Sequence, residues 1–223
     1  MTLAAKRIAR LSAVPALVLL LAACGGGSKS ASPARDANGC IPVKSPAPNR
    51  RREAPPTAAL VASKTYDVTF HTNCGSFTIR LANKTSPKTS ASFVSLARKG
   101  FFDVTIFHRI VPGFVIQGGD PTATGAGGPG YTTVEPPPAS TRYTLGVAAM
   151  AKAPNDPGGA AGSQFFIVTA ADAQLPPDYA LLGKVVRGLA VVKSIGKLGD
   201  ASSGNAGTPT ETVEIQKATV HVS

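Results

Sequence analysis

The stretch FHRIVPGFVIQGGD, which runs from Phe107 to Asp120, decides the fold more than any other part of this sequence. Within it, the pair Pro112-Gly113 separates two short apolar runs, FHRIV and FVIQ. Proline followed by glycine is typical of a turn, and short apolar runs on either side of a turn are typical of paired strands. The stretch therefore predicts two short strands joined by a tight turn.

The polar residues of this stretch predict a site on the surface of those strands. Alternation along a strand places Arg109 on the face of Phe107 and Val111. The same rule places Gln117 on the face of Val115 in the next strand. The pattern predicts a fixed cation and an amide beside an apolar wall, with no nucleophile between them.

The rest of the domain shows mainly strand patterns and two helical ones. Residues 66–81 alternate apolar and polar side chains across a glycine turn, which predicts a hairpin with one buried face. Ser86-Pro87 supplies an N-cap and a first-turn proline for a helix that ends at Gly100. A second helix is expected over residues 189–195, and a final strand with a bulge over residues 213–222. These elements favour a β-barrel with covered ends.

Net charge is high, but its distribution argues against nucleic-acid binding. The 223 residues carry a formal charge of +11. Residues 1–23 contribute +3, and residues 24–64 contribute seven basic against two acidic side chains, which is +5. Only +3 remains for residues 65–223. Because the excess lies outside the predicted domain, a nucleic-acid partner is not expected.

The N-terminus has the form of a secretory signal peptide over residues 1–23. Three basic residues precede Leu11–Ala23, a thirteen-residue apolar run that contains Pro15. A membrane-spanning helix needs roughly 20 apolar residues, so this run is too short to span. Its end, LAACG, resembles the bacterial lipobox, which implies a lipid on Cys24 and an exported protein held at the extracytoplasmic face of a bacterial membrane. An ordinary cleaved signal is the alternative.

Residues 24–64 predict a flexible tether. They are rich in Gly, Ser, Pro and Arg and show little apolar periodicity. The basic run Arg50–Arg52 either is a solvated part of this linker or touches anionic lipid headgroups.

The cysteines predict one disulfide. If Cys24 is lipidated, Cys40 and Cys74 remain as a pair in a compartment where disulfides persist. Such a bridge would pin the end of the tether onto the domain. Two unpaired thiols are the alternative.

Three segments of the chain resemble the cyclophilin-type peptidyl-prolyl isomerases. FHRIVPGFVIQGGD is similar to that family's first signature almost residue for residue. MAKAPNDPGGAAGSQFFI, residues 150–167, resembles its second signature, and LPPDYALLGKV, residues 175–185, resembles the loop and strand that close its proline pocket. The resemblance runs from about Tyr66 to the C-terminus. It implies a mainly β fold, an eight-stranded antiparallel β-barrel capped by two α-helices, over residues 65–223.

The resemblance also implies an activity and a site. It implies a prolyl isomerase that acts on X-Pro bonds of exported proteins, with Arg109 and Gln117 as catalytic residues and proline-containing polypeptides as partners. The substrate-binding residues that it implies are Phe114, Val115, Met150, Ala151, Lys152, Gln164, Phe166, Leu175 and Tyr179. No cofactor and no metal are expected, and a monomer is expected. The alternatives are a non-catalytic module or chaperone that binds proline segments, and a solute-binding lipoprotein.

The sequence departs from the best-known members of that family at three positions. Gln174 stands where a tryptophan often lines the drug-binding edge, Tyr179 replaces a histidine, and Lys152 replaces an asparagine. The missing tryptophan implies weak binding of cyclosporin. His108 is more typical of a structural histidine than of a general base. The glycine-rich residues 124–130 lack the lysine and the helix of a phosphate loop, which favours a loop that shapes the pocket.

Overall fold

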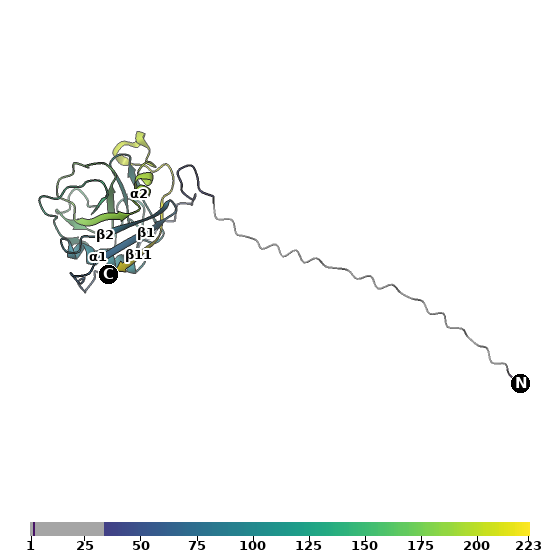
Figure 1. The fold of residues 1–223 in the computed structure, drawn as a ribbon, viewed down its shortest axis with the longest axis horizontal. Helices are drawn as coiled ribbons and strands as arrows, with labels where there is room; N and C mark the ends of the chain where they lie inside the picture. Colours follow the sequence, from purple (N-terminus) through teal and green to yellow (C-terminus); the bar gives the residue numbers. More distant parts are fainter. Residues whose placement is uncertain (1, 3–33) are drawn as a thin grey trace. The chain divides into compact units, whose positions relative to one another are not determined.

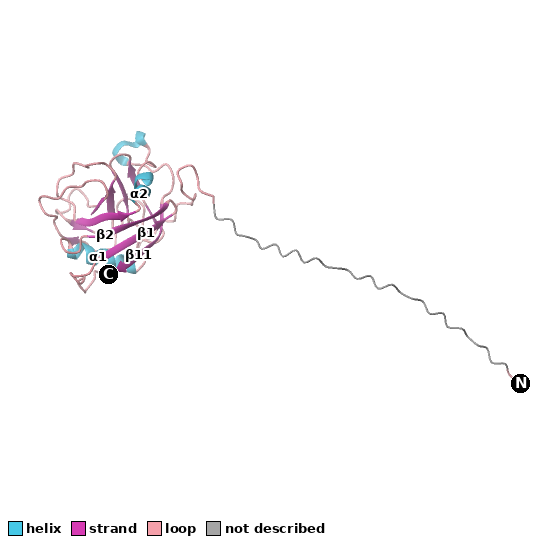
Figure 2. Cartoon of the chain, in the orientation of Figure 1, coloured by secondary structure: helices cyan, strands magenta, loops and turns pink. Residues whose placement is uncertain are grey.

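The strands of this protein form a curled antiparallel sheet with the helices outside it (Figures 1 and 2). The computed structural model describes Thr2 and residues 34–223, and residues 34–223 belong to one compact unit. The predicted signal peptide, residues 1–23, and the predicted acylation site Cys24 lie outside the described residues. Within the described part, no helix has the length and apolar character that crossing a membrane requires.

The main sheet contains nine strands in the order β3-β11-β1-β2-β10-β7-β9-β5-β4, and β6 pairs separately with β8. Each pair is antiparallel, which confirms the predicted mainly β class. The strands are β1 (Tyr66–Thr72), β2 (Gly75–Leu81), β3 (Thr105–Ile106), β4 (Arg109–Val111), β5 (Val115–Gly118), β6 (Thr133–Val134), β7 (Val147–Met150), β8 (Ala160–Ala161), β9 (Phe165–Val168), β10 (Leu181–Arg187) and β11 (Glu214–Val222). The predicted bulge in the last strand is confirmed by a register shift opposite His71 and Thr72.

The main sheet has nine strands where eight were predicted, because one of the predicted strands is interrupted. Only Phe107 and His108 separate β3 from β4. β3 pairs with β11 and β4 pairs with β5, while an Ile106–Asp120 bridge joins the end of β3 to the residues that follow β5. Counted as one bent strand, β3 and β4 restore the eight-stranded arrangement.

The same interruption corrects one prediction about the site. Phe107 and Ile110 are both fully buried in the core of the barrel, although strand alternation would place them on opposite faces. The break at Phe107–His108 therefore changes which face each later residue occupies, and Arg109 lies outside the core. The prediction that Arg109 shares a face with Phe107 is wrong.

Two α-helices, α1 (Pro87–Arg98) and α2 (Leu189–Ile195), and a 3-10 helix, η1 (Ala201–Ala206), accompany the sheet. Ser86 occupies the N-cap position of α1, but its side chain makes no capping hydrogen bond. The carboxylate of Glu135 instead accepts hydrogen bonds from the N–H groups of Lys88 at 3.1 Å and Thr89 at 2.8 Å. An anion at this end also interacts favourably with the helix dipole. The side-chain cap of α1 that was predicted for Ser86 is thus supplied by Glu135, from a distant loop.

Alternate residues of the paired strands β5 and β9 enter two different apolar clusters. On β9, Phe165 belongs to the core inside the barrel, whereas Phe166 belongs to a second cluster on its outer face. On β5, Ile116 points to the core and Val115 to the outer cluster. Because side chains alternate along a strand, one set of strands fills the core and also builds an apolar surface outside it.

The segment predicted as a flexible tether is docked on the domain over its described part, residues 34–64. The N–H of Ile41 donates to the carbonyl of Asn73, that of Asn49 to Pro121, and that of Glu53 to Pro129, each at 2.8 Å. Cys40 is 1% exposed and belongs to the core cluster. The flexible tether therefore does not extend to residue 64. Backbone hydrogen bonds hold much of the segment, which explains how it docks although it carries few apolar side chains.

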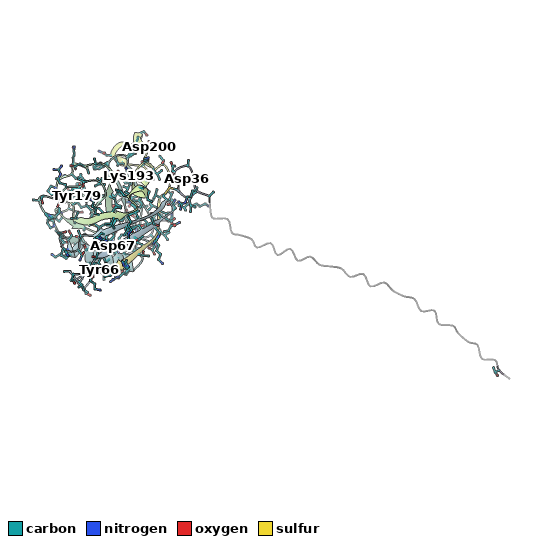
Figure 3. All side chains as sticks on the ribbon, viewed as in Figure 1. Asp36, Tyr66, Asp67, Tyr179, Lys193 and Asp200 are labelled. Atoms are coloured by element: carbon teal, nitrogen blue, oxygen red, sulfur yellow. A yellow bond between two sulfur atoms is a disulfide. The ribbon has the colours of Figure 1, made fainter. Side chains whose placement is uncertain are left out.

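A Cys40–Cys74 disulfide ties this segment to the turn between β1 and β2. Next to it, the carboxylate of Asp36, labelled in Figure 3, accepts hydrogen bonds from the N–H groups of Asn38 at 2.8 Å and Cys40 at 2.9 Å. Asp36, Cys40 and Glu211 form the one described group with potential metal ligands close together. Since the Cys40 sulfur is bonded to Cys74, it is not a free thiolate ligand.

Candidate active site

The outer apolar cluster brings together most of the predicted wall of the proline pocket. Phe114, Val115, Phe166, Leu175 and Tyr179 all belong to it, as does Ala151. The rings of Phe166 and Tyr179 meet edge to face, with centroids 5.4 Å apart. β5 and β9 supply the floor, and the loop after β9 supplies the side. The result is an apolar surface of the kind that a proline ring needs.

Met150 is the exception among the predicted wall residues. It is 1% exposed and belongs to the core inside the barrel. Its β7 neighbour Ala149 faces the outer cluster instead, as alternation requires. The prediction that Met150 lines the proline pocket is therefore wrong.

Arg109 lies at the edge of this cluster in a fixed orientation. Strand pairing places it directly opposite Gln117. Its Nη1 donates to Oε1 of Gln117 at 3.2 Å, and its Nε donates to the carbonyl of Asn205 in η1 at 3.0 Å. Its guanidinium carbon lies 6.0 Å from the centre of the Phe114 ring. Burial lowers the pKa of Arg109, because a charge is less stable away from water.

Two amides continue the hydrogen bonding away from the guanidinium. Nε2 of Gln117 donates to Oε1 of Gln164 at 3.0 Å. Nε2 of Gln164 donates in turn to the carbonyls of Gly125 at 2.8 Å and Gly127 at 3.0 Å. Each amide orientation is thus set by the next partner, so Gln117 presents its oxygen to Arg109. The predicted residues Arg109, Gln117 and Gln164 form one connected network.

Asp120 organises the loop at the end of this network, a role that the sequence analysis did not assign. Its carboxylate accepts hydrogen bonds from Thr122 (two), Thr124, Gly125 and Gly127, at 2.7–3.1 Å. Burial raises the pKa of Asp120, but these hydrogen bonds outweigh it, and the pKa lies below its ordinary value. A Cβ on Gly127 would lie 1.9 Å from the carboxylate, which explains the glycine. The glycine-rich segment is therefore a shaped loop beside the pocket, as its sequence favours.

Lys152 and Tyr179 lie together on the other side of the cluster. Nζ of Lys152 is 2.8 Å from a carboxylate oxygen of Asp178 and 5.8 Å from the centre of the Tyr179 ring. The hydrogen bond to Asp178 raises the pKa of Lys152. The Lys152 side chain is 7% exposed, so it is a positioned cation rather than a free one.

Tyr143 fixes this side of the pocket and was also missed from sequence. Its hydroxyl donates to the carbonyl of Tyr179 and accepts from the N–H of the same residue at 3.0 Å. Burial raises the pKa of Tyr143 to about 12, so the hydroxyl keeps its proton at neutral pH. No spacing pattern singles out Tyr143; its role follows from contacts with a residue far along the chain. Gln174, by contrast, is exposed, and the expected weak binding of cyclosporin stays a prediction.

A large cleft adjoins the network. Its volume is about 1080 Å³, and Gln117, Ala151 and Gln164 line it together with the loop over residues 122–132. Residues 50–52 of the docked N-terminal segment also line it. The cleft therefore shares side chains with the pocket edge.

The comparisons with known proteins agree with this geometry. A family model described as "Cyclophilin type peptidyl-prolyl cis-trans isomerase/CLD" matches residues 67–220. The peptidyl-prolyl cis-trans isomerase CYP18-2 of Arabidopsis thaliana is 38% identical over 159 residues, which cover 69% of this chain and 93% of that protein. The peptidyl-prolyl cis-trans isomerase ppi1 of Schizosaccharomyces pombe is 39% identical over 157 residues, covering 68% of this chain and 97% of that protein.

A solved structure shows the same fold. The crystal structure of a cyclophilin type peptidyl-prolyl cis-trans isomerase of Cryptosporidium parvum matches with a TM-score of 0.62 and 32% sequence identity. The match covers 70% of this chain and 98% of that chain. A second crystal structure of that protein was obtained in the presence of the dipeptide Ala-Pro, with the same TM-score.

Proposed function

The chain belongs to the family of cyclophilin-type peptidyl-prolyl cis-trans isomerases, and from this premise we propose that it isomerises X-Pro bonds of exported proteins while a lipid on Cys24 holds it at a membrane. The relatives carry the isomerase activity in their names. Export and anchoring are supported by the signal-like residues 1–23 and the LAACG sequence. The disulfide is consistent with an oxidising compartment. We further propose that it acts as a monomer, since one chain supplies the pocket and the cation.

The reaction is slow because it breaks amide resonance. Rotation about the X-Pro bond has a barrier of about 18–20 kcal/mol. Nothing covalent has to form, so the enzyme needs only to bind the twisted transition state more tightly than either planar state. In the twisted state the prolyl nitrogen regains its lone pair and accepts a hydrogen bond. A donor placed at that nitrogen therefore stabilises the transition state selectively.

Arg109 is the proposed donor, and its fixed position beside the apolar pocket is the observation that carries the proposal. A guanidinium has five N–H groups, of which one bonds Gln117 and one bonds Asn205. The other three have no acceptor among the described residues and remain free for substrate. The anchoring bonds leave little reorganisation for the reaction to require, and the ring of Phe114 lies beside the guanidinium, its centre 6.0 Å from the guanidinium carbon. The proline ring would rest on the outer cluster around Val115 and Phe166.

The test is a protease-coupled assay of prolyl isomerisation with the full chain and its Arg109→Ala variant. We expect the variant to lose at least about tenfold in kcat/KM, equivalent to about 1.4 kcal/mol of transition-state stabilisation. Arg109→Lys should also lose activity, because an ammonium cannot keep both anchoring bonds and still reach the substrate. A folded Arg109→Ala variant with unchanged activity would sink the mechanism. A wild-type chain that binds proline peptides without accelerating their isomerisation would favour the non-catalytic alternative.

The proposed location has its own test. Mass spectrometry of protein extracted from membranes should find Cys24 acylated and N-terminal. Cys24→Ser should move the protein out of the membrane fraction without changing its isomerase activity. An unmodified Cys24 in membrane-extracted protein would contradict the lipid anchor and leave the isomerase proposal intact.

A further inference from the structure

Three arginines of the N-terminal segment form part of the wall of the cleft beside the active site. Arg50, Arg51 and Arg52 line it together with Gln117 and Gln164. They lie before the region that the family model matches, residues 67–220. The cationic wall therefore comes from this chain's own N-terminal segment.

The backbone of the segment is held on both sides of the arginines. The N–H of Asn49 donates to the carbonyl of Pro121, and that of Glu53 donates to Pro129, each at 2.8 Å. The carboxylate of Glu53 also meets Nζ of Lys99 at 2.8 Å. Pro121 and Pro129 flank the loop that Asp120 shapes. The backbone on either side of the arginines is thus held to a loop that also lines the cleft.

The three arginines differ in what their side chains do. Arg51 is half-buried, and its Nη1 donates to the carbonyls of Phe101 at 2.6 Å and Gly100 at 3.1 Å. Arg50 and Arg52 are exposed, and neither side chain has a hydrogen-bond or ion-pair partner within the described part of the chain. Arg51 therefore fastens the segment, while Arg50 and Arg52 keep their hydrogen-bonding capacity.

The charges in the cleft do not balance. Among the described residues, those that line it besides the arginines include Lys152 and a single acidic residue, Asp156. Lys152 is paired with Asp178, which does not line the cleft. Two unpaired guanidinium groups are left facing a cleft that has room for a side chain of a bound polypeptide. Guanidinium groups bind carboxylates with two parallel hydrogen bonds, so the matching ligand is an acidic side chain.

We infer that Arg50 and Arg52 select clients that carry an acidic side chain a few residues from the isomerised proline. This inference rests on the proposed function, because the client must present its proline to the pocket. A polypeptide with proline on the outer cluster passes Ala151, which belongs to that cluster and also lines the cleft. Its neighbouring side chains therefore enter the cleft. The pocket selects proline, and the arginines select its surroundings.

The test compares short peptides with one Ala-Pro bond, in which Glu, Gln or Lys occupies each flanking position in turn. Exchange NMR measures catalysed isomerisation without a coupling protease, and titration measures binding of the same peptides. For at least one position we expect kcat/KM for the Glu peptide to exceed that for the Gln peptide by about fivefold, in keeping with exposed ion pairs. The Lys peptide should be slower than the Gln peptide. High salt should reduce the difference, because it screens exposed charges.

Variants assign the preference to the two arginines. Arg50→Gln combined with Arg52→Gln should abolish the preference for Glu and leave turnover of the Gln peptide unchanged. Substitution of both by lysine should retain most of it, and substitution of both by glutamate should reverse it. Lys84→Gln combined with Lys217→Gln removes the same charge from exposed positions outside the cleft and should change nothing.

The possible failures are distinguishable. Turnover of the Gln peptide without any preference for Glu would overturn this inference and leave the isomerase intact. If no peptide is turned over, the proposed function fails, and the titrations still decide whether the arginines prefer carboxylates. In a further outcome, the Arg50→Gln, Arg52→Gln variant still prefers the Glu peptide but no longer binds anionic vesicles more tightly than neutral ones. The two arginines would then contact lipid headgroups rather than the client. That result would also overturn the inference.

Discussion

Asp120→Asn is expected to lower both stability and catalytic efficiency, although Asp120 makes no contact with the proline pocket. Asp120 is 1% exposed and its two oxygens accept five hydrogen bonds from the loop over residues 122–127. Asparagine has nearly the same shape, but one oxygen becomes an N–H₂ donor that faces other donors. One oxygen accepts two of the five bonds and the other accepts three, so at least two bonds are lost in either orientation of the amide.

The size of the effect follows from those lost bonds. A hydrogen bond to a charged group contributes about 1.5–3 kcal/mol, so two of them set an upper range of roughly 3–6 kcal/mol. The loop lies at the surface and can relax toward water, which reduces the loss, and we expect roughly 2–4 kcal/mol in the free energy of unfolding. Denaturant unfolding of the full chain measures it as a shift of the midpoint at constant slope.

The loss of activity follows from the amide network. The carbonyls of Gly125 and Gly127 are the acceptors for Gln164, which orients Gln117, which in turn holds Arg109. If the loop moves, the guanidinium loses its fixed position, and even small misplacements of a reacting group cost large factors in rate. We expect about a tenfold loss in kcat with little change in KM. Thr122→Val, which removes one of the five bonds, should show a smaller loss of both kinds.

Two results would refute this reasoning. Asp120→Asn with full stability would mean that the loop does not depend on the carboxylate. Normal kcat in a folded but destabilised variant would mean that the loop does not position Arg109. Acid gives an independent check, because the pKa of Asp120 is lowered in the folded protein. The ionised Asp120 carboxylate therefore contributes to the free energy of unfolding at pH above its ordinary pKa of 3.8. This contribution is lost as the pH falls through the lower pKa that the group has in the folded protein.

Two further predictions concern His108 and the disulfide. Burial lowers the pKa of His108 below its ordinary value of 6.5, and its ring nitrogens have no hydrogen-bond partner among the described residues. The unfolded chain therefore binds a proton at His108 more readily than the folded chain does, so the free energy of unfolding should fall as pH drops below about 6.5. Over the same pH range the unfolding midpoint of His108→Phe should fall less than that of the wild type. Parallel plots of midpoint against pH for the two proteins would contradict this. Substitution of Cys40 and Cys74 by serine removes a bridge across 34 residues. It should lower the free energy of unfolding, measured with denaturant, by roughly 3–4 kcal/mol in the chain-entropy model. Recovery of both cysteines as free thiols from the wild-type protein would refute the bridge.

Local patterns were sufficient for the first hairpin, for α1 and for the two strands that carry Arg109 and Gln117. The hairpin over residues 66–81 and α1 follow the periods of two and of about 3.6 that their apolar residues show. The turn at Pro112-Gly113 is short, so the register of the strands around it is set locally. That register makes Arg109 and Gln117 direct partners. The contact between Arg109 and Gln117 is therefore encoded by nine consecutive residues.

The faces of individual residues were less predictable. Two face assignments failed: alternation placed Arg109 on the face of Phe107, and resemblance placed Met150 in the pocket, whereas Phe107 and Met150 lie in the core and Arg109 does not. A shift of one residue in a strand exchanges its two faces, and the sequence does not state where β4 resumes after the interruption. Both faces of β7 are apolar, so hydrophobicity does not distinguish Met150 from Ala149.

Asp120, Glu135 and Tyr143 act through hydrogen bonds that periodicity does not encode. A signal for Asp120 was present, because an aspartate followed closely by threonines and glycines is typical of a side chain that bonds nearby backbone. Glu135 and Tyr143 have partners 36 or more residues away, so only the folded chain identifies them.

The docked N-terminal segment changes what the proposed lipid anchor can do. A tether from Cys24 to residue 64 would reach roughly 140 Å when fully extended. Because the disulfide fixes Cys40 to the domain, a lipid on Cys24 could lie no farther from it than the extended length of the chain from Cys24 to Cys40, roughly 55 Å. The bridge and the backbone bonds at Asn49 and Glu53 also keep the arginines at the cleft. If Cys24 carries the proposed lipid, this segment limits the distance from the membrane at which clients are met, and it also supplies the charge proposed to select them.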